Sequence, residues 1–539
     1  MDDDVRRPAP GRRLTGALAR SLTTGCALVL LTTALTGLPA SAAVSCPGAV
    51  AGDVNGDGLA EVVVGEPGHA RGAGAVHVFY GSESGLRTGP AAGVPDDEYL
   101  GQATPGVPGT AEAGDGFGAS ALLADFDGDG CGDLAVGAPG ENDGRGSVTV
   151  LYGSPTGLTT ARAAGWTQNA LLGAGAAQRA EFFGETLAAG DLDDDGRADL
   201  AVGAPSDRVG TAFAGAVTVL LSGPSGLGAA GRTSTVSQAT AGVPGVPEDG
   251  DGFGAALAVG DFDGDDVGDL AVGALGEDDV SGVVEVLPGR AGLGVGRAPA
   301  RALTQDTPGV PGAAEPLDRF GSALAAGDVT GDGVDDLAVG APGENGVDPE
   351  PGYGAGSVTF LPGSADGLTS RGSQGWTQDS PGVQGVAGPE DEFGAALAMG
   401  HLDAGPFLDL AVGAPQDAVG PVRRAGSVTV LHGTAAGLTT AGPGGLRFHQ
   451  DVQGLAGVPE PGDAFGASVA AVAVQTPDVD SLVVGVPGER VTRDRDGMVQ
   501  QLSTFEFGPN PVGSRTLHQD TPGVRGGSAT GDLFGWAVR

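Results

Sequence analysis

Lysine is absent from this 539-residue chain, so all 27 of its basic residues are arginine. Asp and Glu together number 68, and the formal net charge at pH 7 is −41. A surface of that sign repels phosphate backbones, so we expect no nucleic-acid partner. The acid is either a solvated shell or a set of carboxylate cages for divalent cations, and its placement decides which.

Aromatic residues are scarce, at 4% of the chain, yet the hydrophobic fraction of 40% allows a large core built from Ala, Val and Leu. Disorder throughout is therefore excluded. Gly and Pro, with 103 and 37 copies, interrupt helices and mark turns. They exclude a long helical bundle.

Cysteine occurs only three times, at Cys26, Cys46 and Cys131. Cys26 falls in an apolar N-terminal stretch, so at most one disulfide remains for the rest of the chain. That count excludes a cysteine-rich scaffold and a zinc ribbon. The sequence does not favour a bond between Cys46 and Cys131 and leaves the question open.

A continuous apolar run occurs once near the start, at residues 27–38, after several Arg and before Pro39 and the triplet Ala40, Ser41, Ala42. This is the pattern of a secretory signal peptide, and the run is short for a membrane span of about 20 residues. We predict a signal peptide over residues 1–42 and a secreted, extracellular chain over 43–539 without a membrane span. An uncleaved anchor is the alternative.

The rest of the chain is periodic. A Phe-Gly pair recurs every 66 to 73 residues, with its Phe at Phe117, Phe183, Phe253, Phe320, Phe393, Phe465 and Phe534. A Gly-Ala-Pro-like signature follows that Phe by 20 residues in six units, and its first copy begins at Gly65. Constant spacing within units and variable spacing between them indicate a repeated core joined by adjustable loops.

Each unit has the patterns of four short strands. In unit two these are residues 117–125, 133–136, 146–152 and a strand around 166–168. Seven small sheets bury both faces only by packing on one another, which predicts an all-β fold, a seven-bladed β-propeller of four-stranded antiparallel blades. Seven separate domains would be marginally stable.

The chain ends just after Phe534, where a first strand opens, whereas the first unit lacks Phe-Gly. We therefore predict that the N- and C-terminal segments share one blade and so close the ring. The alternative is that residues 43–50 fill that strand themselves.

An acidic nonapeptide lies twelve residues before each of the first five Gly signatures, with oxygen-bearing side chains at positions 1, 3, 5 and 9. The candidate ligands are Asp53, Asn55, Asp57 and Glu61; Asp125, Asp127, Asp129 and Asp133; Asp191, Asp193, Asp195 and Asp199; Asp261, Asp263, Asp265 and Asp269; and Asp328, Thr330, Asp332 and Asp336. Acidic hairpin turns without metal are the alternative.

The spacing suits calcium, which takes six to eight oxygen ligands. Two carboxylates 4 Å apart repel by about 4 kcal/mol at an effective dielectric of 20, so such loops need a cation. We predict about five structural Ca²⁺ ions. In unit six, His401, Asp403, Gly405 and Asp409 keep two acids, and Ala473, Gln475, Pro477 and Ser481 of unit seven keep none, so we expect both to be metal-free.

With Phe-Gly, the D-x-D-x-D-G-x-x-D loop and Gly-Ala-Pro in fixed order, the chain from about residue 51 to 539 resembles the FG-GAP repeats of the integrin α-subunit propeller. The resemblance implies a seven-bladed propeller with calcium-bound loops between the first two strands of a blade. It does not imply a β-subunit partner or which blades carry metal. Secreted bacterial proteins and the propeller of glycan-anchor-cleaving phospholipases share these repeats.

No residue set predicts catalysis. His69 and His77 occur in the first unit only and have no partnered nucleophile, and no Gly-x-Ser-x-Gly elbow is present. Acids before each Phe-Gly, such as Glu248, Asp249 and Asp251, are interpreted as a solvated rim. We predict a monomeric, non-enzymatic binding or adhesion module for a protein or glycan ligand. The alternative is a secreted hydrolase of the phospholipase-propeller type.

Overall fold

The computed structural model describes residues 45–89, 97–228, 232–345, 354–441, 444–505 and 508–539. The chain separates into two units, Met1–Ala43 and Val44–Arg539. The predicted signal peptide lies outside the described residues, and all that follows concerns the second unit.

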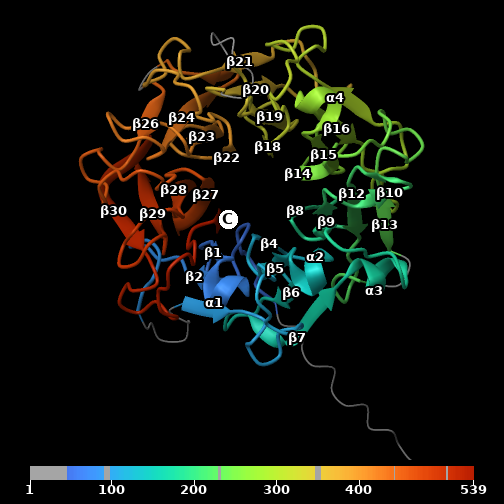
Figure 1. The fold of residues 1–539 in the computed structure, drawn as a ribbon, viewed down its shortest axis with the longest axis horizontal. Coiled ribbons are helices and arrows are strands. Elements are labelled where there is room, and N and C mark those ends of the chain that lie inside the picture. The colour runs from blue at the N-terminus through green and yellow to red at the C-terminus, as the bar shows by residue number, and fades with distance from the viewer. Residues whose placement is uncertain (1–44, 90–96, 229–231, 346–353, 442–443, 506–507) are drawn as a thin grey trace, which may run out of the picture. The chain divides into compact units, whose positions relative to one another are not determined.

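Seven antiparallel sheets follow one another along the second unit, and Figure 1 shows them succeeding each other around one axis from blue to red. Blades two, four, five and seven each take four strands in simple order. They are β4 Ser120–Ala124, β5 Asp133–Ala138, β6 Ser147–Tyr152, β7 Thr159–Trp166; β14 Phe253–Gly260, β15 Asp269–Ala274, β16 Val283–Leu287, β17 Arg301–Leu303; β18 Ala323–Gly327, β19 Asp336–Ala341, β20 Ser357–Leu361, β21 Gln374–Trp376; and β27 Ser468–Thr476, β28 Val479–Val486, β29 Met498–Phe505, β30 Gly508–Leu517.

The other three blades carry small additions. Blade three adds a hairpin, blade six adds β25, and blade one takes its fourth strand from the C-terminus. They comprise β8 Thr186–Gly190, β9 Asp199–Ala204, β12 Ala216–Leu220, β13 Thr233–Val236 with hairpin β10 Arg208–Val209 and β11 Ala212–Phe213; β22 Ala396–Gly400, β23 Asp409–Ala414, β24 Ser427–Thr434, β25 Gly437–Thr439, β26 Leu446–Phe448; and β1 Val62–Glu66, β2 Ala75–Phe79, β3 Asp97–Leu100, β31 Ala537–Val538.

Among the described residues, helix is confined to four short turns, α1 His69–Gly72, α2 Glu141–Gly144, α3 Gln168–Leu172 and α4 Glu277–Val280. The fourth strand of unit two ends earlier than expected, because Gln168 opens α3. The side chain of Thr167 caps that turn by accepting a hydrogen bond from the Ala170 N–H. The predicted all-β seven-bladed propeller is otherwise confirmed.

The ring closes as predicted. β31 pairs with β1 through Val64–Val538 and Gly65–Ala537, and the backbones of Val63 and Arg539 exchange hydrogen bonds of 2.8 and 3.1 Å. Residues 45–50 form no strand, so the alternative closure is wrong. The innermost strand of blade one therefore comes from the opposite end of the chain.

The two sequence signatures meet between blades. Gly137 of the Gly-Ala-Pro signature faces the next Phe-Gly pair, and a Cβ built on it would lie 2.0 Å from the Gly184 carbonyl oxygen. The equivalent distance is 2.1 Å at Gly65 and 2.1 Å at Gly485, on either side of the closing blade. The Phe of each pair is fully buried, as in Phe183, which packs with strands of blades two and three. The first residue of the Gly-Ala-Pro signature must therefore be glycine, because the backbone of the next Phe-Gly pair approaches it too closely for a Cβ.

Candidate functional site

The twenty predicted ligands all lie in described residues, in five loops that lead into the second strand of a blade. In blades two to five the loop joins that strand to the innermost strand, and in blade one it precedes β1. The loops are separate sites. In blade one, ligand atoms of Asp53, Asp57 and Glu61 lie within 4.8 Å of one another. In blade two the same holds for Asp125, Asp127 and Asp133.

The position-1 carboxylate shapes each loop. In blade two, Asp125 accepts backbone N–H groups from Gly128 at 2.7 Å and Gly130 at 2.9 Å. Gly130, at position 6, has a φ of +86°, a left-handed conformation that glycine adopts without strain. Asp53, Asp191, Asp261 and Asp328 bind their own loops in the same way. The loop therefore folds around its first acid.

The position-9 acid ties the loop to the rest of the blade. Asp133 accepts the Phe126 N–H at 2.9 Å and the Gly153 N–H at 2.8 Å, so one buried carboxylate joins three segments. Burial raises the pKa of Asp133 to about 8. It also raises the pKa of Asp199 and of Asp269 to about 7 and that of Asp336 to about 6. Burial disfavours the charged form of each of these carboxyl groups, and a positive charge bound beside them would favour it.

Position 3 offers oxygens with no donor. The buried atoms Asp127 Oδ1, Asp193 Oδ1, Asp263 Oδ1 and Thr330 Oγ1 make no hydrogen bond within the described part of the chain. Buried polar atoms normally have a partner, so each orphan oxygen leaves one bond to be made. In blades two and three the second carboxylate oxygen is held by an arginine, Arg162 on Asp127 at 2.7 Å and Arg232 on Asp193 at 2.5 Å. A hard cation that prefers oxygen fits the remaining atoms.

The loops are also chained to each other. The position-8 N–H of one loop donates to the position-1 carbonyl of the preceding loop, as Gly132 does to Asp53 at 2.7 Å. The same bond recurs for Ala198–Asp125, Gly268–Asp191, Asp335–Asp261 and Asp480–His401, and Ala60–Ala473 carries it from blade seven to blade one. Fixing one loop therefore constrains its neighbour in each of these six pairs.

Blades six and seven lack the full set of acids, and other side chains lie in their loops. His432 Nδ1 lies 3.3 Å from both Asp403 and Asp409, so an imidazole stands between the two remaining carboxylates. In blade seven, Ser481 donates to Gln475 at 3.2 Å and Gln501 donates to Ser481 at 3.1 Å. Neither arrangement offers the oxygen set of the first five loops.

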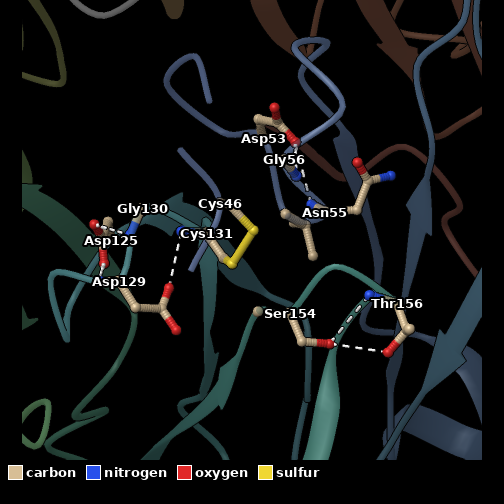
Figure 2. Close-up of a disulfide and its surroundings, with 12 residues drawn as sticks. Cys46, Asp53, Asn55, Gly56, Asp125, Asp129, Gly130, Cys131, Ser154 and Thr156 are labelled. Carbon is tan, nitrogen blue, oxygen red and sulfur yellow. Dashed lines mark hydrogen bonds between the residues drawn. A yellow bond between two sulfur atoms is a disulfide. The ribbon is translucent and has the colours of Figure 1, made fainter. Parts of the chain in front are cut away.

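Cys46 and Cys131 form a disulfide, which the sequence did not favour. Figure 2 shows it between the acidic loops of blades one and two. Cys131 is position 7 of the second loop, and the Cys46 N–H donates to the Asp129 carbonyl at 3.0 Å. The two residues are 85 apart in sequence, and only the packing of blade one against blade two brings them together.

At the other end of the strands lies a cluster that sequence reasoning missed. Each blade interface there buries a glutamine and an acid, for example Gln102 and Asp115, and Gln102 donates to Glu141 at the start of α2. Gln238–Glu277 and Gln305–Glu344 repeat the pair at 2.8 and 2.6 Å. The sequence contains a signal for this cluster. A Gln lies 15 residues before every Phe of Phe-Gly, and an acid lies two residues before it, which is Glu181 in unit three and Asp in the other six units.

The acids before Phe-Gly are therefore not a solvated rim throughout. Asp251 is 4% exposed and accepts the Glu248 N–H at 2.6 Å, and burial raises its pKa. Asp391 is equally buried, and burial raises its pKa to about 7. These side chains brace the turn that leads into each new blade.

The histidines differ in their surroundings. His69 and His77 of blade one lie together beside Glu66, and His77 is fully buried. His449 and His518 occupy turns, where burial lowers their pKa values. No nucleophile, base and acid aligned for acyl transfer occur among the hydrogen bonds of the described residues.

Known proteins with the same repeats are similar to this chain. The FG-GAP repeat model matches residues 48–79, 117–151, 183–220, 253–292 and 320–361. Integrin alpha-PS2 of Drosophila melanogaster is 32% identical over 262 residues, which cover 47% of this chain and 16% of that protein. The phosphatidylinositol-glycan-specific phospholipase D of Rattus norvegicus is 32% identical over 180 residues, covering 32% of this chain and 20% of that protein. The chain thus spans a fifth or less of these relatives.

Among solved structures, a rhamnogalacturonan lyase from Bacillus licheniformis aligns over 83% of this chain and 70% of its own, with 13% identity and a TM-score of 0.32. In the described residues, no helix is long and apolar enough to cross a bilayer.

Proposed function

The chain is an integrin-like FG-GAP repeat propeller, and from that premise we propose that it is a calcium-stabilised binding module for a protein or glycan ligand outside the cell. The observation that carries the calcium assignment is the set of orphaned, buried oxygens at position 3 of blades two to five. Each lies in a loop whose position-1 and position-9 carboxylates are held by backbone N–H groups, so the cage is already shaped.

Each ion would take side-chain oxygens from positions 1, 3, 5 and 9 of one loop, with the carbonyl of position 7 and water completing the shell. The residues are those of blades one to five, about five ions in all. Bound calcium would add positive charge beside these carboxylates, and the loop-to-loop hydrogen bonds would carry the added rigidity from one loop to the next. Blades six and seven, closed by His432 and by Gln475 with Ser481, would take none.

Calcium content decides this part of the proposal. Elemental analysis of the purified chain should give about five Ca²⁺, and chelation should lower the melting temperature in calorimetry. Asp127→Asn should remove about one ion. Asp403→Asn in blade six is the matched control and should leave the count unchanged. A chain that holds no alkaline-earth ion and melts alike with and without EDTA contradicts the assignment.

We propose the signal peptide at residues 1–42, with export and a monomeric chain in solution. The relatives support an extracellular place, because integrin-like FG-GAP propellers act there. Protein sequencing of the secreted chain should find Ala43 at the N-terminus. A first residue upstream of position 27 contradicts the cleavage site.

A hydrolase function is the second candidate, favoured only by the similarity to phosphatidylinositol-glycan-specific phospholipase D. Incubation of the calcium-loaded chain with a glycosylphosphatidylinositol-anchored protein separates the two. The binding module should release no soluble product, while it should retain ligands from a glycan or protein array in calcium and lose them in EDTA. Turnover abolished by one substitution in a folded variant would favour the hydrolase.

A further inference from the structure

Three positions of blade one depart from all six other blades. Glu66 stands where the others have Ala or Val, as at Ala138. His69 replaces the Glu or Asp that opens the following turn, as at Glu141, and His77 replaces Thr, Glu or Gln of the third strand. Blade one thus has its acid at the end of β1, where the other blades have it in the following turn, and it has two histidines that the other blades lack at these positions. The repeat alone gives no reason for the exchange.

These side chains converge with Asp532 at the end of β1 that lies away from the acidic loop. Glu66 Oε1 lies 3.8 Å from His69 Nδ1 and 3.5 Å from His77 Nε2. His69 Nδ1 lies 3.7 Å from Asp532 Oδ1. Zinc bonds of about 2.0 to 2.1 Å in a tetrahedron place the ligand atoms about 3.4 Å apart. The Glu66–His69 and His69–Asp532 spacings exceed that value by only a few tenths of an ångström, and the ligand atoms of these three residues all lie within 4.8 Å of one another.

The converging atoms have no other partners. Glu66 and His77 are fully buried, yet Glu66 Oε1, His77 Nε2 and His69 Nδ1 make no hydrogen bond to any described residue. A buried polar atom left unpaired costs about 1 to 3 kcal/mol. One cation bound between Glu66 and His69 would satisfy two of these atoms.

The remaining atoms of the ligands are held from outside. Asp97 Oδ1 lies 3.1 Å from His77 Nδ1, which leaves Nε2 free toward Glu66. Gln519 donates to Glu66 Oε2, and the Ala529 N–H donates to Asp532 Oδ2 at 2.6 Å. Asp97 therefore orients His77 toward Glu66, and outer groups that hold the ligands in this way are the usual support of a zinc site.

We propose that Glu66, His69 and Asp532 form a site for Zn²⁺ or a similar divalent transition metal, with His77 beside Glu66 as a positioning residue. Imidazole nitrogen beside carboxylate favours such metals over Ca²⁺, which prefers oxygen alone. Asp532 comes from the C-terminal segment and the other two ligands from the first blade. The metal therefore joins the two ends of the chain across the seam where the ring closes, independently of the calcium loops.

The test uses the full chain, stripped of metal and then saturated with Ca²⁺. Calorimetric titration with Zn²⁺ should show one tight site, Co²⁺ in its place should give the visible absorption of a tetrahedral ion, and zinc should raise the melting temperature. The Glu66→Ala/His69→Glu variant copies Ala138 and Glu141 of blade two and should bind no zinc. Asp97→Asn should weaken zinc binding about 10- to 100-fold.

The controls address folding and specificity. Calcium content and the zinc-free melting curve report whether the double variant is folded. His449→Thr, which copies Thr167, should bind zinc like the unaltered chain. If the unaltered chain takes up no zinc in calcium buffer, the proposal is overturned. His77 then forms internal ion pairs with Glu66 and Asp97 and has no role at a metal site. The proposal is also overturned if the double variant binds zinc as tightly as the unaltered chain. It is overturned as well if His432→Tyr, which removes the imidazole beside Asp403 and Asp409 in blade six, abolishes zinc binding.

Discussion

A single methyl group at Gly137 tests why the Gly-Ala-Pro signature contains glycine. Gly137→Ala places a Cβ 2.0 Å from the Gly184 carbonyl, so blades two and three must move apart. We expect a loss of about 1 to 3 kcal/mol, seen as a lower melting temperature. Gly223→Ala is the control, because nothing lies within 4 Å of its added Cβ. Equal melting of the two variants would show that the signature does not act through this contact.

Glu285 of β16 gives a prediction for pH. Burial, together with the nearby carboxylates of Glu277 and Asp251, raises its pKa to about 8, while Gln238 opposes the shift. The folded chain therefore keeps this proton at pH values where the unfolded chain, with a pKa near 4.5, has lost it. The contribution of Glu285 to stability falls as pH rises from about 4.5 to 8 and is constant above.

Glu285→Gln should remove that slope. At pH 5 the variant and the unaltered chain should melt at similar temperatures. At pH 8.5 the variant should be more stable, by about 1 to 3 kcal/mol, because no buried charge forms. Melting curves at both pH values measure this. A variant that is less stable at pH 8.5 would mean that Glu285 is ionised and paired in the folded chain.

At the scale of elements, the loops determine how neighbouring blades are joined. The Cys46–Cys131 bond holds the segment before β1 against the second acidic loop. Its closed loop spans 85 residues, for which disulfides stabilise by about 2 to 5 kcal/mol. Cys46→Ser/Cys131→Ser should lower the melting temperature in calcium accordingly.

Peptide mapping without reduction gives the companion measurement. The linked peptide should appear in the unaltered chain and account for both cysteines. If it is present and the double serine variant melts like the unaltered chain, the bond does not stabilise the propeller.

At the scale of the whole molecule, stability depends on closure by a strand of two residues, β31. Deletion of residues 534–539 removes Phe534, buried between blades seven and one, together with the partner of β1. An open ring exposes the flanks of two blades, so we expect a sharp fall in melting temperature. Trp536→Ala is the control, since Trp536 is 48% exposed. An unchanged curve for the truncated chain would show that closure contributes nothing.

Much of this fold followed from the sequence because the repeat is strict. The spacing of Phe117 to Gly137 recurs in six units, and a rigid blade is what keeps such a spacing constant. The same spacing predicted that the innermost strand of blade one comes from the C-terminal segment, as β31 does. The acidic loops were placed because their ligands lie within nine residues, where local backbone geometry decides which side chains meet.

What the sequence alone determined, then, is whatever repeats or is local: seven blades, their order, the closing tail and five acidic loops. Only the tertiary structure decided the pairing of Cys46 with Cys131 and the meeting of Glu66, His69 and Asp532. The physical reason is distance along the chain. Residues 66 and 532 become neighbours only when the last strand enters the first sheet, and no local pattern encodes the contacts that ring closure creates.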